Sequence, residues 1–194
     1  MLDSVFRTPP LYDDSYYGFP IHEIREMTVM NMGNYAHGNQ PAQHMIYLYN
    51  YAGEPWKAQY RVREVMEKFY SPTPDGYCGD EDNGQTSAWY VFSALGFYPV
   101  CPASNEYVLG SPLFKNTSIH LENGKQVIIN AKGNNPNYVY ISKMKLNGKE
   151  HTHNYITHET LTKGAEINIQ MSEHPNTSRG TALNDRPYSF SNEK

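Results

Sequence analysis

The sequence predicts an α plus β chain with a helical half followed by a β-rich half. From about Pro20 to Leu95 apolar residues recur at three- and four-residue intervals, the period of amphipathic helices. Past about Ser104 this period disappears and short runs rich in β-branched and aromatic residues begin. Asn-Gly pairs at 123–124 and 147–148 favour tight hairpins between such runs. We therefore expect helices first, then a small antiparallel β-sheet or sandwich.

Proline and glycine residues divide the helical half. Pro41 opens a helical run that stops at Gly53, and Pro55 opens the next one. This second run predicts an amphipathic helix of roughly four turns, which ends before residues 71–76 (SPTPDG) because two prolines and a glycine cannot continue it. A third helix is expected over 86–95, closed by Gly96. The apolar stripe of the second helix consists of Trp56, Tyr60, Val62, Val65, Met66 and Phe69.

The β-rich half begins at about residue 104. Strands are expected at 106–109, 118–121, 126–131, 138–146, 153–156 and 167–171. The stretch from Pro175 onward is polar and is expected to fray. The predicted organisation is therefore a helical domain over 1–103, a β-rich region over 104–174 and a polar tail over 175–194.

Composition excludes some partners and favours others weakly. The net charge of −4 comes without long runs of one sign, so neither nucleic acid nor an anionic membrane is expected as a partner. No apolar run reaches the length of a membrane span, and the first residues lack the apolar core of a signal peptide.

The 17 tyrosines suit a sugar cleft, because the ring is apolar and the hydroxyl is polar, but Tyr is also an ordinary boundary residue. Cys78 and Cys101 match no zinc signature and are expected to be unpaired.

An acidic turn is the strongest chemical signal of the chain. Residues 79–85 (GDEDNGQ) place Asp80, Glu81 and Asp82 between two glycines, directly before the predicted helix at 86–95. Crowded carboxylates repel one another, so such a cluster often serves a metal, a proton transfer or a cation. If the turn caps the helix, the helix dipole favours ionised carboxylates, which suits a general base. The structural alternative is an acidic N-cap whose other charges face water. A calcium loop of the EF-hand type fails, because Gly79 and Tyr90 would occupy its anchoring carboxylate positions.

A second polar cluster covers residues 37–41 (HGNQP), ahead of the run that Pro41 opens. His37, Asn39 and Gln40 offer hydrogen bonds and oxygen ligands, although, taken alone, capping by Asn39 is the commoner explanation. His151 and His153 alternate on a predicted strand but lack a third ligand, so they make a weak metal site. Tryptophans at 56 and 89 are expected in the core rather than as sugar platforms.

Five motifs together resemble glycoside hydrolase family 92. They are residues 35–41 (YAHGNQP), 47–57 (YLYNYAGEPWK), 75–85 (DGYCGDEDNGQ), 87–99 (SAWYVFSALGFYP) and 107–112 (YVLGSP). Members of that family are calcium-dependent exo-acting α-mannosidases that invert the anomeric centre. The resemblance runs over most of the chain and implies the last helices of an (α/α)6 toroid, here the 1–103 part, followed by the family's β-rich end.

The resemblance also implies roles for particular residues. An inverting glycosidase needs a carboxylate base and a carboxylic acid roughly 6.5–9.5 Å apart, with a water between the base and the sugar. The family's base maps onto the acidic turn, with Asp82 as the first choice and Asp80 as its partner in holding the water. His37, Asn39, Glu81 and Gln85 are expected to contact a mannose-containing glycan. Asn39 and Gln40 are expected at the calcium, which in the family grips the 2- and 3-hydroxyls of mannose.

Two departures from the family pattern matter. The motif usually reads Gly-Asn-Glu-Pro followed by two histidines, whereas this chain has Gln40 and then Ala42-Gln43-His44. Replacing the acid by an amide keeps one oxygen ligand but removes a charge, which should weaken the binding of calcium. The family's general acid lies in an upstream Glu-Gly-Asn segment that these 194 residues do not contain. The N-terminal part of the enzyme, which would supply that acid, is therefore an expected partner.

Three functional hypotheses follow. The first is the C-terminal part of an inverting exo-α-mannosidase that is inactive alone. The second is a non-catalytic mannose-binding or pseudoenzyme module, and the third is a truncated reading frame that aggregates through an exposed apolar face. Members of the family are usually secreted or periplasmic, and this chain shows no signal peptide of its own.

Overall fold

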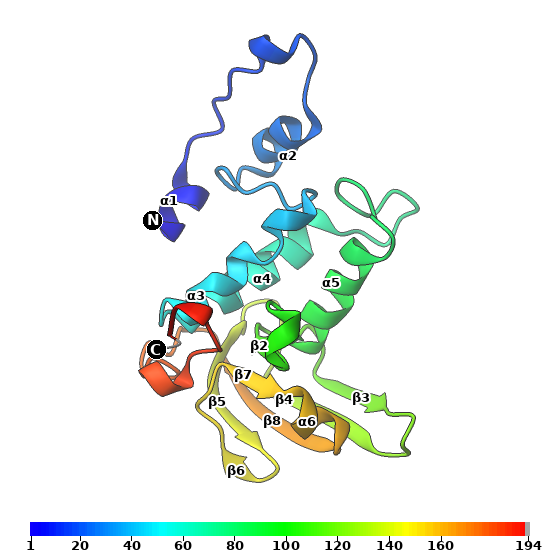
Figure 1. The fold of residues 1–194 in the computed structure, drawn as a ribbon, viewed down its shortest axis with the longest axis vertical. Helices are drawn as coiled ribbons and strands as arrows, with labels where there is room; N and C mark the ends of the chain where they lie inside the picture. Colours follow the sequence, from blue (N-terminus) through cyan, green and yellow to red (C-terminus); the bar gives the residue numbers. More distant parts are fainter. Residues whose placement is uncertain (193–194) are drawn as a thin grey trace. The chain divides into compact units, whose positions relative to one another are not determined.

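A computed structural model describes residues 1–192, and the chain divides into two compact units. Unit 1 comprises Met1–Met45 and Glu64–Tyr90, and unit 2 comprises Ile46–Arg63 and the chain from Val91 onward. The helices are α1 (Leu2–Arg7), α2 (His22–Met30), α3 (Leu48–Tyr51), α4 (Pro55–Phe69), α5 (Gln85–Leu95) and α6 (His158–Thr162) (Figure 1). The strands are β1 (Phe97–Tyr98), β2 (Glu106–Leu109), β3 (Asn116–His120), β4 (Gln126–Lys132), β5 (Tyr140–Leu146), β6 (Lys149–Glu150), β7 (Tyr155–Thr157) and β8 (Ala165–Ser172). The α plus β class is confirmed, while the boundary at 103/104 and the toroid stay predictions.

Helices α4 and α5 confirm the helical periodicity. Helix α4 spans 15 residues, about the predicted four turns, and buries Val62, Val65, Met66 and Phe69. The prediction was wrong for Tyr60, whose side chain is 44% exposed. Gln59 is buried beside it instead, where its Oε1 accepts a hydrogen bond from the Ile141 amide at 2.9 Å. Periodicity alone therefore chose the wrong neighbour: Gln59, which has a backbone partner, is buried, and Tyr60 is exposed.

The helix expected to open at Pro41 is largely absent. The chain forms short 3₁₀ turns at Gln40–Ala42 and Met45–Tyr47, and only α3 is α-helical. Side chains take over carbonyl groups that an α-helix would pair: Trp89 Nε1 donates to the Gln43 carbonyl at 3.3 Å, and Asn50 Nδ2 donates to the Tyr47 carbonyl at 3.0 Å. Because these carbonyl groups have partners already, the segment does not need a regular helix.

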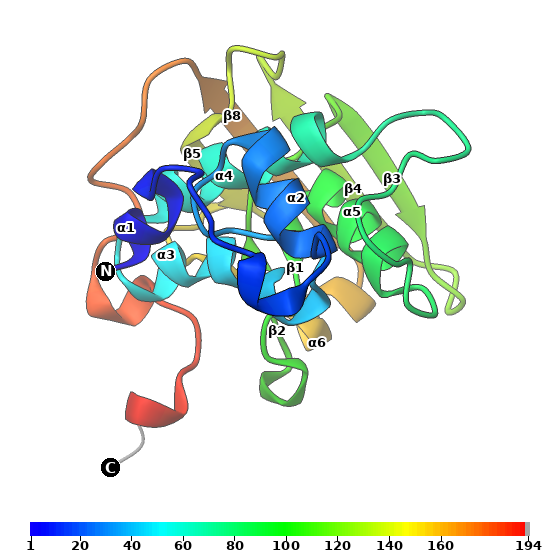
Figure 2. The same cartoon turned by 90° about the horizontal axis from the view of Figure 1, so that it is seen from above.

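Two sheets form the β-rich part of unit 2. A three-stranded sheet has the order β1-β2-β7, and a five-stranded sheet has the order β3-β4-β8-β5-β6. The paired strands β3 and β4 lie side by side in Figure 2. The Asn-Gly hairpins join β3 to β4 and β5 to β6, as predicted. The expectation of a purely antiparallel sheet was wrong, because β4 pairs with β8 in parallel. Residues 133–164 connect these two strands, and that length permits the crossover a parallel pair needs.

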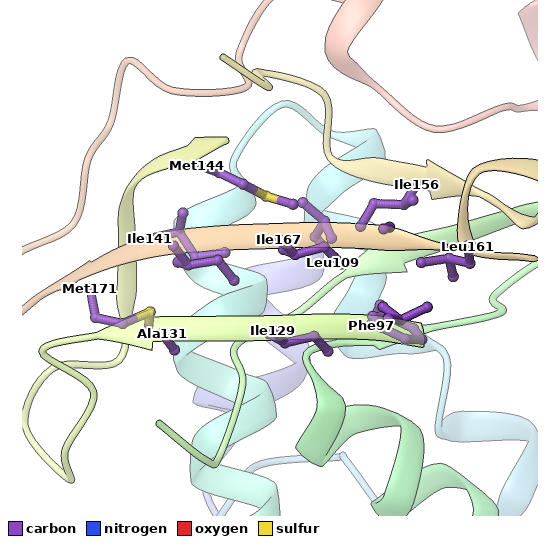
Figure 3. Close-up of a cluster of buried hydrophobic side chains, with 13 residues drawn as sticks. Phe97, Leu109, Ile129, Ala131, Ile141, Met144, Ile156, Leu161, Ile167 and Met171 are labelled. Carbon is purple, nitrogen blue, oxygen red and sulfur yellow. The ribbon is translucent and has the colours of Figure 1, made fainter. Parts of the chain in front are cut away.

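Both sheets and the end of α5 share one hydrophobic core. Along β8 buried and more exposed residues alternate, so Ile167, Ile169 and Met171 point inward together. Figure 3 shows the side chains of β4, β5 and β8 meeting Phe97, Leu109, Ile156 and Leu161. Phe92 and Leu95 of α5 pack against this cluster. The sheet therefore stacks on other elements through one apolar face and leaves the opposite face polar.

Residues of the predicted tail between 175 and 192 bond to the rest of unit 2, which corrects the expectation of fraying there, while residues 193–194 lie outside the described part. Arg179 is only 9% exposed, and its guanidinium donates to the carbonyl groups of His151 at 2.9 Å and His153 at 3.2 Å. Asp185 is also buried and accepts a hydrogen bond from the Thr152 hydroxyl at 2.6 Å. The polar residues of this segment find partners in the fold, so polarity did not mean mobility here.

Unit 1 contains less regular structure. Helix α2 buries none of its residues, and large apolar side chains stay exposed along the first thirty residues, with Leu11 at 87%, Phe19 at 66% and Val29 at 71%. Both cysteines are free thiols, as expected. Among the helices of residues 1–192, none combines the length and apolar character needed to cross a bilayer.

Candidate active site

The acidic turn lies directly before α5 in unit 1 and is built from left-handed residues. The backbone φ angle is 50° at Asp82, 56° at Asn83 and 97° at Gly84. Asp, Asn and Gly are the residue types that adopt this conformation at least cost. The sequence order Asp-Asn-Gly therefore reverses the chain sharply and delivers it to the first turn of the helix.

Glu81 is the carboxylate that caps α5. Its Oε2 accepts from the Gly84 amide at 2.7 Å, and its Oε1 accepts from the hydroxyl and the amide of Ser87. The Ser87 hydroxyl, and after it the Gly84 amide, lower the pKa of Glu81 below its usual range. The acidic cap that composition suggested is thus provided by Glu81. Its carboxylate, which was expected to contact the glycan, is therefore already hydrogen-bonded within the turn. A direct role of Glu81 in substrate binding stays a prediction.

Asp80 and Asp82 present exposed carboxylates on either side of this cap. Within residues 1–192 neither carboxylate has a hydrogen bond or ion pair. Asp80 also borders a groove of about 500 Å³, whose other lining residues are His22, Arg25, Glu26, Val29, Met30, Cys78 and Gly79. These two side chains are therefore open to water and to a ligand, as the proposed base and its partner need to be.

The groove contains groups that the sequence did not single out. Burial raises the pKa of the Glu26 carboxyl, and both of its oxygens accept from the Gly38 amide, at 3.0 and 3.1 Å. Burial and the nearby Glu26 charge raise the pKa of the Cys78 thiol to about 12. The thiol is therefore neutral at physiological pH and is not a nucleophile.

Residues 37–41 approach the acidic turn so closely that glycine is required at positions 38 and 79. A Cβ atom on Gly38 would lie 2.9 Å from both the Cα and the amide nitrogen of Gly79. A Cβ atom on Gly79 would lie 2.5 Å from the Gly38 carbonyl oxygen. Any larger residue would push the two backbones apart. This contact brings residues 37–41 and 79–85 together, as the resemblance implied.

A hydrogen bond across this contact ties Gln40 to the turn. Its Nε2 donates to the Asp80 carbonyl at 2.7 Å, and the Thr86 hydroxyl donates to the same carbonyl at 2.9 Å. Asn39 is exposed, and its side chain makes no capping bond to the turn that follows, so the capping alternative is not seen. Gln85 is partly buried, and its Nε2 donates to Gln43 Oε1 at 3.2 Å.

His37 is fully buried and lies between two tyrosine hydroxyls. Its Nδ1 is 2.6 Å from the Tyr35 hydroxyl, and its Nε2 is 2.8 Å from the Tyr70 hydroxyl. Burial lowers the pKa of His37 to about 3, so the imidazole is neutral. A glycan contact by this ring stays a prediction, and it would require one of the two tyrosine bonds to break.

The polar residues present fit a calcium ion only in part. Calcium takes six to eight oxygen ligands and prefers carboxylates among them. Asn39 and Gln40 offer two neutral amide oxygens, and the part of the chain that the structure describes holds no cluster of three His, Cys, Asp or Glu side chains. The two amides alone do not make a calcium site, so the remaining ligands would come from other groups. His151 and His153 likewise form no metal cluster.

The two motifs are connected by residues that the sequence did not single out, of which Gln43 and Thr86 are buried and Tyr70 is partly buried. None of these three residues was given a role, although Gln43 lies two residues after the 35–41 motif and Thr86 lies between the 75–85 and 87–99 motifs. Gln43 is 1% exposed and Thr86 is 0% exposed. The available signal was a polar residue close to a motif. It does not reveal the partner, because Gln43 and Thr86 are 43 residues apart.

Comparison with known proteins gives consistent matches. The model of the glycosyl hydrolase family 92 catalytic domain matches residues 1–173. A curated protein of Arthroderma benhamiae, described as an uncharacterized secreted glycosidase, is 33% identical over 156 residues, which is 79% of this chain and 20% of that protein.

Two solved structures from Bacteroides thetaiotaomicron are also similar. The family GH92 inverting mannosidase BT2199 is 58% identical with a TM-score of 0.83, over 98% of this chain and 26% of that one. The family GH92 alpha-mannosidase BT3965 is 35% identical with a TM-score of 0.84, over 97% of this chain and 23% of that one. The chain thus spans about a quarter of the length of these solved structures.

Proposed function

This chain belongs to glycosyl hydrolase family 92, and we propose that it forms the C-terminal part of an inverting exo-α-mannosidase. The observation that carries the proposal is the junction of two motifs in unit 1, where Gln40 binds the main chain of Asp80. Similarity to a solved inverting mannosidase over 98% of the chain supports the same reaction class. The substrate class is then a glycan with a terminal α-mannoside, and the secreted relative favours an extracytoplasmic location.

In the proposed reaction Asp82 is the general base. Its exposed carboxylate takes a proton from a water, and the oxygen of that water attacks the anomeric carbon from the face opposite the leaving group. Asp80 accepts the other hydrogen of the water and orients it. The cap made by Glu81 supports this division of roles, because it satisfies the helix terminus and leaves the other two carboxylates accessible.

Two components of the reaction are assigned to groups outside this chain. The general acid, which protonates the leaving oxygen, is proposed to lie in the N-terminal part of the enzyme. Calcium would bring Lewis-acid chemistry to the mannose hydroxyls when bound, with Asn39 and Gln40 supplying two of its oxygens. Gln40 carries no charge, so we expect this chain to contribute less to calcium binding than a family member with Glu there.

The base assignment is tested in a chimera in which this chain replaces the matching part of BT2199. Asp82→Ala should lower kcat on an aryl α-mannoside by roughly 10²- to 10⁴-fold, because loss of a general base typically costs this much. Asp75→Ala is the matched control, since it removes an exposed carboxylate a few residues upstream and should leave kcat near that of the parent chimera.

Product stereochemistry tests the reaction class independently. Proton NMR of the parent reaction should show β-mannose as the first product, which mutarotates later. Near-parental rates in Asp82→Ala would refute the base assignment, and α-mannose as the first product would refute inversion. A chimera that binds mannobiose in calorimetry without hydrolysing it would favour the mannose-binding module instead.

A further inference from the structure

A chain of hydrogen bonds runs through unit 1 from the buried Tyr35 and His37 to the acidic turn. It begins at the Tyr35 hydroxyl, passes through the His37 ring to the Tyr70 hydroxyl, and continues to the Thr86 carbonyl, 3.3 Å from Tyr70. The Thr86 hydroxyl then donates to the Asp80 carbonyl at 2.9 Å. Five residues from three separate stretches of the sequence are thus linked in one path that reaches Asp80, two residues before the proposed base.

The donors and acceptors along this path can be assigned from chemistry. A carbonyl only accepts, so the single hydroxyl proton of Tyr70 points to Thr86, and the Tyr70 oxygen must accept from His37 Nε2. A neutral imidazole with a proton on Nε2 has an acceptor at Nδ1, and the Tyr35 hydroxyl donates to it. Every polar hydrogen on the path therefore points toward the acidic turn.

Packing holds the path in one arrangement. The His37 ring meets the Trp89 ring edge to face with centroids 4.3 Å apart, and Trp89 stacks on Tyr70 with planes 8° apart. Gln43 Nε2 donates to the His37 carbonyl at 3.3 Å and lies 3.5 Å from the Thr86 hydroxyl oxygen. Gln43 therefore contacts two residues of the path. His37, Thr86 and Trp89 are all 0% exposed. A path packed in this way has little freedom to rearrange.

We propose that His37 is a positioning residue, which acts through Tyr70 and Thr86 to fix the main chain at Asp80. This inference rests on the proposed function, because the path can matter for catalysis only if the acidic turn carries the general base. The turn itself needs such support, since Asp82 and Asn83 are in left-handed conformations and both aspartate side chains are exposed. A general base works well only when it is held within a fraction of an ångström of its productive position, at hydrogen-bond distance from its water.

The alternative is that the path is a satisfied polar core with no bearing on catalysis. Both explanations predict a loss of stability when a member is removed. Only the positioning role predicts that kcat falls with little change in KM, because the substrate contacts stay while the base loses its alignment. Only a role that depends on the Thr86 hydroxyl predicts rescue by serine, which keeps that group.

The protonation state of His37 is tested first, on the full 194-residue chain with ¹⁵N-labelled histidine. Long-range ¹H–¹⁵N spectra should show one neutral histidine with its proton on Nε2, unchanged between pH 5 and pH 8. The His37→Gln variant assigns the signal by removing it. A signal with the proton on Nδ1, or one that titrates in this range, would overturn the proposed path.

The positioning role is tested next by kinetics in the BT2199 chimera. Thr86→Val should lower kcat about 10-fold with KM little changed, since it removes one buried hydrogen bond to Asp80. Thr86→Ser should retain most of the parent kcat. Tyr70→Phe interrupts the path elsewhere and should also lower kcat, whereas Tyr16→Phe is the matched control because Tyr16 is 91% exposed.

The outcomes separate this proposal from the proposed function. Equal kcat values for Thr86→Val, Tyr70→Phe and the parent chimera would overturn the positioning role, even if Asp82→Ala is inactive. If Thr86→Val does not fold, Tyr70→Phe decides the same question. A parent chimera without mannosidase activity would refute the proposed function, while the histidine spectra would still decide whether the path exists.

Discussion

At the scale of single residues, Gln40 shows how one atom type decides a contact. Its amide nitrogen donates to the Asp80 carbonyl at 2.7 Å, a bond that a glutamate could not make because a carboxylate only accepts. The departure from the family motif therefore has a structural counterpart in this chain. The amide ties the two motifs directly, while a carboxylate at the same place would need a cation between itself and the carbonyl.

Gln40→Glu should reveal this exchange. Without calcium we expect a loss of about 1 kcal/mol in unfolding free energy, because a hydrogen bond is replaced by two facing acceptors. Added calcium should raise the Tm of Gln40→Glu more than that of the parent, because the new charge favours a divalent cation. Thermal unfolding with calcium or with a chelator measures both effects.

Gln126→Glu is the matched control for this change. It adds the same charge on an exposed position of β4 and should show no extra calcium response. Equal calcium shifts in the parent and in Gln40→Glu would contradict the expectation.

At the scale of elements, the start of α5 organises the site. The Glu81 carboxylate accepts from the Ser87 amide of the first turn and from the Gly84 amide just before the helix. The amides of Gln85 and Thr86 donate to the carbonyl groups of Asp82 and Glu81. Two left-handed residues and a glycine precede the helix and turn its first residues back toward the Asp80 carbonyl. The cap, the turn and the helix thus form one local structure that presents Asp80 and Asp82 to solvent.

The lowered pKa of Glu81 predicts how this cap responds to pH. A carboxylate with a depressed folded-state pKa adds stability above its unfolded pKa of about 4.3, and that stability is lost as the pH falls through the folded value. Glu81→Gln should therefore have a lower Tm than the parent at pH 7, and the two values should converge as the pH drops below about 4.

Glu122→Gln serves as the matched control for the cap, because Glu122 is exposed in a hairpin loop and makes no cap. Thermal unfolding from pH 3 to pH 7 makes the comparison. A Tm difference between Glu81→Gln and the parent that is independent of pH would contradict an ionic cap.

At the scale of the whole molecule, we propose that this chain supplies one side of the active site of a longer enzyme. The structure describes a turn with a proposed base, a junction of two motifs and a β-rich unit with its own core. The relatives are about four times longer than the part that this chain matches. The exposed apolar residues of α2 and of the segment before it are also surfaces that a further part of such an enzyme could cover.

The isolated chain should therefore fail to hydrolyse an aryl α-mannoside, with or without calcium. A base without an acid on the opposite side of the sugar leaves the departing oxygen unprotonated, and this loses a contribution of roughly 10²- to 10⁴-fold. A chromogenic assay of the chain beside the BT2199 chimera makes the comparison at equal concentration. Calcium-dependent turnover by the chain alone would contradict this division of the site.

Much of the fold was predictable because its signals are local. The helices α4 and α5, both Asn-Gly hairpins and the alternation along β8 follow from residues near one another in the chain. The failures share a physical cause. In the run after Pro41 the Gln43 carbonyl is bonded by Trp89, 46 residues away, and the tail is held by Arg179, which finds carbonyl partners around residues 151–153. Such partners are set by the fold and leave no periodicity in the sequence.

For this protein the sequence alone determined the family, the acidic turn and the pair of motifs that meet in unit 1, since each depends on residue types in a short, ordered stretch. Only the tertiary structure decided which carboxylate caps α5, which atoms hold Asp80, and that His37 lies between Tyr35 and Tyr70. It also decided the parallel pairing of β4 with β8. The reason is that the partners Gln40 and Asp80, and His37 and Tyr70, are more than thirty residues apart and meet only when the chain has folded. The choice among three adjacent carboxylates depends on the backbone conformation of the folded turn.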